Sequence, residues 1–159
     1  MRYYILFYLF LTAAICKDIA NDDIIVIKLP SYINITFKKQ KIRTIRCNKD
    51  FIRPLFKAFE CLKDRKLNNL LLTYGGCYCY RKIAGRDKLS NHAHGMAIDL
   101  NTQGPELPPA AIACFKRAGL LWGGDWAGRR DPMHFEKKLQ PRIRSLIWRK
   151  IEEIDYGRL

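Results

Sequence analysis

The three histidines of the chain fall into two short segments, and each segment also contains an aspartate. His92 and His94 precede Asp99, and Asp131 precedes His134. Imidazole and carboxylate groups are common zinc ligands, and a catalytic zinc site uses three of them and keeps the fourth position for water. The residue types therefore predict a metal site to which two distant segments of the chain contribute.

The spacing within the two segments predicts a role for each side chain. The residues around Asp99 alternate as in a β-strand, and Gly95 permits a sharp turn that folds His92 back toward Asp99. His92 and Asp99 would then share one metal, with His134 as the third ligand. Asp131 precedes His134 by three residues, so it is expected beside the metal, where it takes a proton from the bound water as general base.

Two motifs make this prediction more specific. They are Ser90-x-His92-x-x-Gly95-x-Ala97-x-Asp99, and Gly123-Gly124-Asp125-Trp126 followed by Asp131-x-x-His134-Phe135-Glu136. In this order and at this separation they resemble the zinc peptidases of the D-alanyl-D-alanine carboxypeptidase family. That family includes the vancomycin-resistance D,D-peptidases and the L-alanyl-D-glutamate phage endolysins. The resemblance extends over about residues 50–138.

The resemblance implies the roles of the site residues. The implied ligands of one zinc ion per chain are His92, Asp99 and His134. Asp131 is implied as the catalytic base. Members of the family also stabilise the developing oxyanion with an upstream arginine, for which Arg81 is the first candidate and Arg86 the second.

Four further side chains are expected around the substrate. They are Ser90, His94, Asp125 and Trp126. His94 occupies a position that the motif leaves free, so it is expected to line the pocket or support a ligand rather than to bind metal. Ser90 is expected to orient the site through a hydrogen bond, with a simple turn residue as the alternative. For Asp125 and Trp126 the alternative is a role in the core and in capping.

The resemblance also implies a fold and a reaction. The fold is the small α+β domain shared with Hedgehog signalling domains, with helices packed on an antiparallel sheet that carries the zinc ligands. The reaction is hydrolysis of an amide bond in a peptidoglycan stem peptide by metal-activated water. Removal of a terminal D-alanine and cleavage inside the stem, as by L-Ala–D-Glu endopeptidases, both remain open, as does the choice between wall remodelling and lysis. A non-catalytic zinc-binding domain that binds cell wall or a protein partner is the alternative.

Hydrophobic patterning predicts the elements that position these residues. The expected strands are 24–29, 32–37, 70–74 and 133–136, with a short strand around Asp99. The expected helices are 50–66, 108–118 and a terminal helix over 143–154. Strands and helices in irregular order predict an α+β domain.

The first sixteen residues read as a secretory signal peptide. Arg2 is followed by an uncharged apolar run that is shorter than the about 20 residues of a membrane-spanning helix. Cleavage is expected after Cys16. Lipidation of Cys16 is less favoured, because Ile15 rather than a small residue precedes it. Residues 17–159 are then one zinc peptidase domain, secreted or periplasmic, monomeric and without a stable membrane span.

The chain is strongly basic, with 29 Lys+Arg against 15 Asp+Glu and a formal net charge of +14 among its 159 residues. For an exported protein this charge indicates anionic cell-wall polymers as partners, with a merely solubilising surface charge as the alternative. The signal peptide disfavours nucleic acid, although a basic nucleic-acid- or membrane-binding protein with incidental histidines is the third hypothesis. The basic stretch from Lys38 to Arg46 is expected to be a solvated strand or loop.

Five cysteines follow Cys16, and their positions are Cys47, Cys61, Cys77, Cys79 and Cys114. They permit two disulfides and one leftover thiol, with a connectivity that the sequence leaves open. Cys77 and Cys79 are not expected to pair with each other. On an extended segment they point to the same face about 6 to 7 Å apart, farther than a disulfide allows.

Overall fold

A computed structural model of the chain describes residues 21–139, so the predicted signal peptide and the predicted terminal helix lie outside the described part. The strands are β1 Ile24–Lys28, β2 Thr36–Phe37, β3 Gln40–Lys41, β4 Thr44–Asn48, β5 Tyr74–Gly76, β6 Ala97–Leu100, β7 Leu121–Trp122 and β8 His134–Glu136. The helices are α1 Lys49–Asp64 and α2 Pro109–Arg117, with 3₁₀ turns η1 Asn68–Leu70, η2 Asn91–His94 and η3 Gly123–Asp125.

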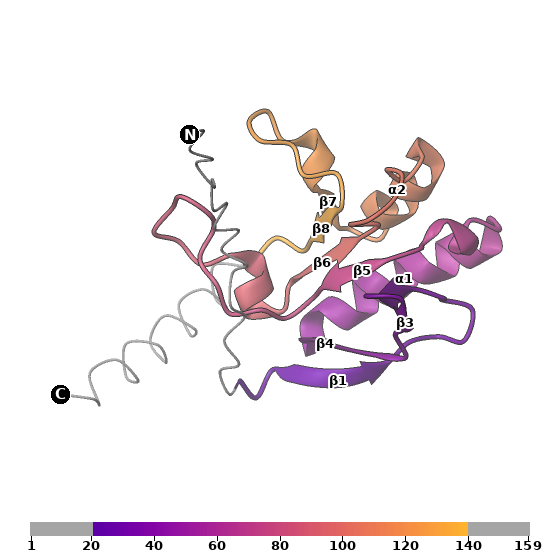
Figure 1. Cartoon of the computed structure of the whole chain (residues 1–159), viewed down its shortest axis with the longest axis horizontal. Helices are drawn as coiled ribbons and strands as arrows, with labels where there is room; N and C mark the ends of the chain where they lie inside the picture. Colours follow the sequence, from indigo (N-terminus) through magenta and orange to yellow (C-terminus); the bar gives the residue numbers. More distant parts are fainter. Residues whose placement is uncertain (1–20, 140–159) are drawn as a thin grey trace, which may run out of the picture.

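An antiparallel sheet in the order β5-β6-β8-β7 forms the centre of the fold (Figure 1). Two antiparallel ribbons, β1–β4 and β2–β3, accompany it. The two helices and the antiparallel strands make a small α+β domain, as the sequence predicts.

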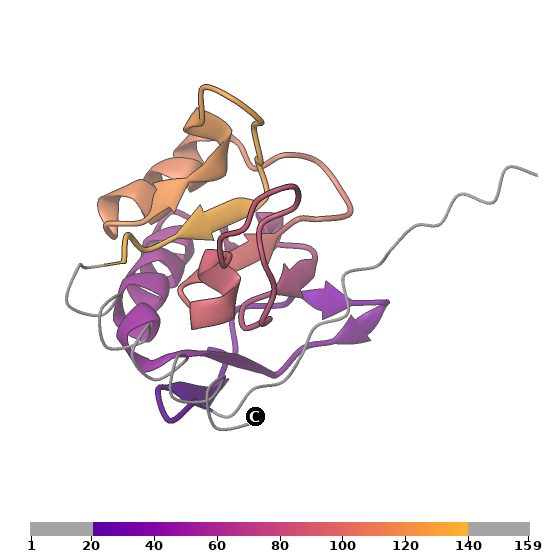
Figure 2. The same cartoon turned by 90° about the vertical axis from the view of Figure 1, so that its left-hand side faces the viewer.

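Helices α1 and α2 lie side by side along one face of the central sheet (Figure 2). The Asn48 side chain accepts a hydrogen bond from the Asp50 backbone N–H and so caps α1, which satisfies one of the donors that a helix start leaves unpaired. The buried face of α1 consists of Phe51, Leu55, Ala58, Phe59 and Leu62 at helical spacing. On α2 the Phe115 ring stacks on Phe135 of β8 with centroids 4.1 Å apart.

Side-chain alternation divides the central sheet into an apolar face and a polar face. Ile98 and Leu100 of β6 and Phe135 of β8 are fully buried in the core beneath the helices. Neighbouring residues on a strand point to opposite faces, so Asp99 and His134 belong to the face away from the helices. The polar groups of the site therefore share the side that the helices leave uncovered.

Two predicted strands are wrong in extent. Of the predicted strand 32–37 only Thr36 and Phe37 pair in a ribbon. Ile33 and Ile35 are buried from irregular backbone, so core burial produced the alternating pattern without a strand ladder. The positive φ angles of Lys38 (48°) and Lys39 (66°) make the tight turn that follows.

The predicted strand 70–74 begins only at Tyr74, and it includes the two glycines that were expected to end it. In the segment before Tyr74, one bridge to Thr36 of β2 and the side chain of Asn101 supply the hydrogen bonds in place of a continuous ladder. The Asn101 amide group donates to the Leu70 carbonyl at 2.8 Å, and its oxygen accepts from the Leu72 N–H at 2.8 Å. The remaining predicted strands and helices within residues 21–139 are confirmed with small shifts of their ends.

Two disulfides join elements of the fold. Cys61–Cys114 links α1 to α2, and Cys47–Cys77 links the end of β4 to the segment after β5. Cys79 is disulfide-bonded as well, so the predicted leftover thiol is wrong for the cysteines of the described part. Cys77 and Cys79 do not pair with each other, as predicted. No helix within residues 21–139 is long and apolar enough to cross a membrane.

Candidate metal centre

Asp99 and His134 are placed by the strand ladder itself. They are direct partners in the antiparallel pair of β6 and β8, so both side chains leave the same face of the sheet side by side. The His134 Nδ1 atom lies 3.0 Å from the Asp99 Oδ1 atom. Both residues are buried, with 9% and 5% of their surfaces exposed. Backbone pairing thus fixes two candidate ligands.

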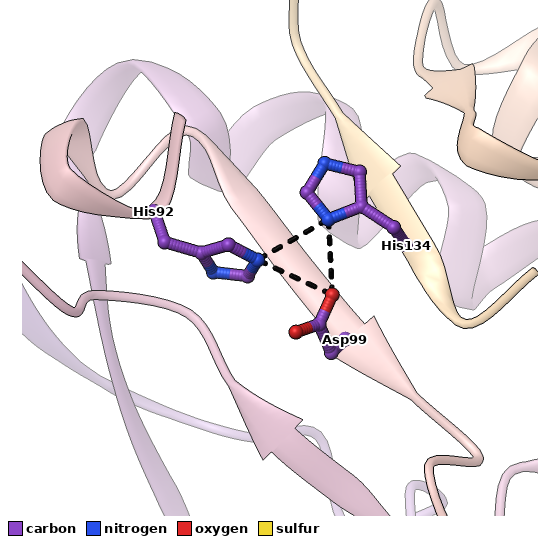
Figure 3. A group of neighbouring side chains, drawn as sticks. All are labelled: His92, Asp99 and His134. Atoms are coloured by element: carbon purple, nitrogen blue, oxygen red, sulfur yellow. Dashed lines mark hydrogen bonds and ion pairs between the residues drawn. The ribbon is translucent and has the colours of Figure 1, made fainter. Parts of the chain in front are cut away.

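His92 reaches these two residues from the 3₁₀ turn η2. The Ser90 hydroxyl oxygen caps this turn by accepting from the His92 backbone N–H at 3.3 Å. Gly95 ends the turn with a φ of 62° and returns the chain to β6. The His92 Nε2 atom then lies 3.2 Å from Asp99 Oδ1 and 3.2 Å from His134 Nδ1 (Figure 3). The predicted fold-back of His92 toward Asp99 is confirmed.

The three donor atoms suit a zinc ion. A tetrahedral zinc site with ligands at about 2.0 to 2.1 Å places neighbouring donors about 3.3 Å apart. The observed triangle has edges of 3.0, 3.2 and 3.2 Å. Two imidazoles and one carboxylate are also the donor set of several catalytic zinc sites. His92, Asp99 and His134 are therefore a buried group that could hold a metal ion.

The charges of the cluster favour a cation at its centre. Burial opposes ionisation of Asp99, but hydrogen bonds with His134 and His92 outweigh it and hold the pKa of Asp99 well below its ordinary value. Burial would lower the pKa of His134. Hydrogen bonds with Asp99 and Glu136 outweigh this effect and raise the pKa of His134 to about 9. Without a metal, a proton on His134 therefore compensates the buried carboxylate.

The outward ring nitrogens of the two histidines also have partners. The His92 Nδ1–H donates to the Cys77 carbonyl at 2.9 Å, and the His134 Nε2–H donates to the Glu136 carboxylate at 2.9 Å. Sequence reasoning assigned no role to Cys77 or Glu136 at the site. Glu136 lies two residues after His134 on a strand, and this spacing could have placed it on the same face. The Cys77 carbonyl has no such signal, because backbone groups leave no mark in a sequence.

Asp131 lies in the turn that leads into β8. Its backbone N–H donates to the Gly123 carbonyl at 3.0 Å, and its own carbonyl accepts from the His134 N–H at 3.1 Å. Gly123 has no room for a side chain, because a Cβ atom there would come within 2.5 Å of the Asp131 carbonyl oxygen. Burial, and then the nearby negative charge of Asp99, raise the pKa of the half-buried Asp131 carboxyl. The turn therefore holds a carboxylate close enough to the cluster to interact with its charges.

A hollow of about 260 Å³ adjoins the Asp131 turn. Its lining consists of Leu100, Asn101, Gly104, Glu106, Leu107, Asp131, Pro132 and Met133.

The other predicted site residues lie at different places around the cluster. The Trp126 ring lies 5.2 Å from the His134 ring, with 39% of the residue exposed, so it forms a wall beside the third ligand. Asp125 instead forms an ion pair with Lys116 of α2 at 2.6 Å. His94 is not one of the three clustered residues, and its backbone carbonyl accepts from the Asn48 amide at 3.2 Å.

Arg81 is tied to the site through its backbone. Its carbonyl accepts a hydrogen bond from the Ser90 N–H at 3.0 Å, so the loop between them closes next to the turn that carries His92. Within residues 21–139 its guanidinium group has no hydrogen-bond partner. Arg86, the second candidate, is exposed in that loop.

The fold and the cluster define a class of protein, which is a small α+β domain with a His–Asp–His group suited to a metal ion. A sequence model of the family described as D-alanyl-D-alanine carboxypeptidase matches residues 84–137. This match confirms the resemblance that the two motifs predict, over the segment that holds all three clustered side chains and Asp131. Arg81 lies before the matched segment. No curated protein matches the chain.

Proposed function

We propose that the protein is a secreted, zinc-dependent peptidase that hydrolyses amide bonds in peptidoglycan stem peptides. The family match supports a peptidase, and the buried His–Asp–His cluster supports a metal-dependent one. The observation that carries the proposal is Asp131, a half-buried carboxylate in the turn before a candidate ligand. A domain that only binds metal or cell wall has no need of a carboxylate base at this position.

In the proposed reaction His92, Asp99 and His134 hold one zinc ion. When bound, zinc supplies a Lewis acid that polarises a carbonyl oxygen and lowers the pKa of water. Asp131 accepts the proton of the attacking water and delivers it to the leaving amine nitrogen. Arg81 remains the proposed partner of the developing oxyanion, a role for which it has a free guanidinium group within the described part of the chain.

The surroundings of the cluster are consistent with a peptide substrate. The Trp126 ring beside His134 offers an apolar wall for a substrate side chain. Both a terminal D-alanine and an internal bond of the stem are compatible substrates. Secretion is supported by the disulfides, which persist in oxidising compartments.

The test uses the purified protein, with its zinc content measured, and isolated muropeptides analysed by mass spectrometry. We expect about one zinc per chain and release of D-alanine or of a larger stem fragment. Asp131→Ala should retain zinc and lose activity by about 10²- to 10⁴-fold, as expected for loss of a general base. Asp64→Ala removes the same charge from the exposed end of α1 and should leave activity unchanged. Zinc binding without cleavage of any muropeptide would favour the non-catalytic domain instead.

We also propose that the basic surface attaches the protein to anionic cell-wall polymers. Lys38, Lys39, Lys41 and Arg43 are all exposed on and beside the β2–β3 ribbon. Replacing the four by glutamate should abolish sedimentation with purified cell walls at low salt. Unchanged sedimentation would refute this role.

A further inference from the structure

Glu136 holds the outward nitrogen of one candidate ligand. Its Oε2 atom accepts from the His134 Nε2–H at 2.9 Å, on the side of the ring opposite to Nδ1, which faces Asp99. Both residues lie on β8, and their spacing of two places them on one face of the sheet. Glu136 is not one of the three clustered residues, so its contact is with the ligand and not with the metal position.

Glu136 is itself held in place. The Asn91 amide of η2 donates to the same Oε2 atom at 2.7 Å. The carboxylate is largely buried, with 17% of its side chain exposed. Asn91 immediately precedes His92, so one short turn carries both a ligand and the residue that fixes Glu136. A buried carboxylate with two donors on one oxygen keeps a single orientation better than a solvated one.

The two histidines are supported differently. His92 donates its outward N–H to the neutral Cys77 carbonyl, whereas His134 donates to a charged carboxylate. A proton fixed on Nε2 leaves the Nδ1 lone pair free toward the centre of the cluster. A carboxylate acceptor also makes the ligating nitrogen more basic, and outer partners of this kind typically contribute 10- to 100-fold to metal affinity.

We propose that Glu136 is a positioning residue that fixes the Nδ1-ligating tautomer of His134 and tightens metal binding, with Asn91 holding its carboxylate in place. This inference rests on the proposed function only in placing zinc at the three side chains. It assigns a role to the last residue of the second motif, which the ligand and base assignments leave unused.

The test measures zinc affinity by competition with a chromophoric chelator. Glu136→Ala should bind zinc 10- to 100-fold more weakly than the wild type. Glu136→Gln should lose less, because an amide oxygen still accepts the N–H while the charge is gone. Glu60→Ala and Glu60→Gln, on the exposed face of α1, are the matched controls and should retain wild-type affinity. Asn91→Ala should weaken binding by less than Glu136→Ala.

A second readout separates positioning from a general structural role. In the zinc-loaded wild type, the ¹⁵N shifts of the His134 ring should show a protonated Nε2 and a ligating Nδ1. In Glu136→Ala the Nε2 proton should exchange with water much faster, while the His92 ring signals stay unchanged. The free energy of unfolding of each zinc-free variant shows whether the fold persists. If Glu136→Ala does not fold, the zinc affinity of the near-isosteric Glu136→Gln variant tests the proposal.

Each outcome has a distinct meaning. Equal zinc affinity for the wild type and both Glu136 variants overturns the inference and leaves the proposed peptidase intact. A ligating Nε2 in the wild type also overturns it. Weaker zinc binding by the Glu136 variants supports the inference even if no muropeptide is cleaved, in which case only the peptidase proposal fails. A wild type that binds no zinc overturns both.

Discussion

Gly95 is a position at which one added methyl group should disturb both the fold and the site. Its φ of 62° lies in the left-handed region, and it stands between the turn that carries His92 and the strand that carries Asp99. A Cβ atom there would lie 2.6 Å from the Asn48 backbone nitrogen and 2.6 Å from the Ile24 Cδ1 atom. The Asn48 N–H also donates to the Gly95 carbonyl at 3.0 Å, so the two segments cannot separate without losing this bond.

These contacts set the size of the effect of Gly95→Ala on the free energy of unfolding. The left-handed conformation costs an alanine about 1 to 2 kcal/mol. Overpacking against backbone, with loss of the hydrogen bond from Asn48, adds about 1 to 3 kcal/mol. Gly119→Ala is the matched control, since Gly119 has a φ of 87° but open space around its Cβ position. The control should therefore lose only the stability that the left-handed conformation costs an alanine.

The assay is urea unfolding of zinc-free protein with its disulfides intact, followed by zinc affinity of the same variants. Gly95→Ala should lose about 2 to 5 kcal/mol and Gly119→Ala about 1 to 2 kcal/mol. Only Gly95→Ala should bind zinc more weakly, because it displaces His92 from Asp99. If the two variants lose the same stability, or if Gly95→Ala binds zinc normally, close packing at Gly95 does not position the site and the reasoning is refuted.

Three further predictions concern stability. The pKa of His134 is raised to about 9 in the fold from an ordinary 6.5, so its contribution to the stability of the zinc-free protein should be complete below about pH 6.5. The protein should lose on the order of 3 kcal/mol of this contribution between about pH 6.5 and pH 9 in denaturant titrations, and His134→Gln should remove this loss. Replacing Cys61 and Cys114 by alanine opens a loop with a sequence separation of 53 and should lower the free energy of unfolding by about 4 kcal/mol. Zinc affinity should be retained, because this disulfide joins the helices on the face of the sheet opposite the site; a large loss of affinity would contradict this. Asn101→Ala removes the four side-chain hydrogen bonds of a buried residue at φ 57° and should lower the melting temperature more than alanine at exposed Asn69.

The ligand set was predictable because its geometry follows from local rules. His92 and Asp99 are close in sequence with Gly95 between them, so strand alternation and one left-handed residue suffice to bring them together. His134 is distant in sequence; its residue type and the carboxylate near it indicate a third ligand, and the motif resemblance implies the same role. The pairing of β6 with β8 places His134 opposite Asp99, and no local sequence pattern predicts which two strands pair.

The errors have physical causes. Ile33 and Ile35 alternate like strand residues, yet they are buried from irregular backbone whose partners the pattern cannot reveal. The apolar segment before Tyr74 reads as a strand, but the Asn101 side chain bonds to its backbone. Asn101 lies far along the chain, so the local pattern cannot reveal this contact. The disulfide connectivity depended in the same way on contacts between distant elements.

The Cys47–Cys77 bond has a consequence for when the site can form. The carbonyl that orients His92 belongs to Cys77, so the backbone that aims this ligand is tied to β4 by a cross-link. A newly made chain in a reducing compartment lacks that tie, because its thiols are kept reduced there. If the protein is exported as proposed, His92 would therefore gain its cross-linked support only after oxidation, and the site would take its final shape outside the compartment in which the chain is made.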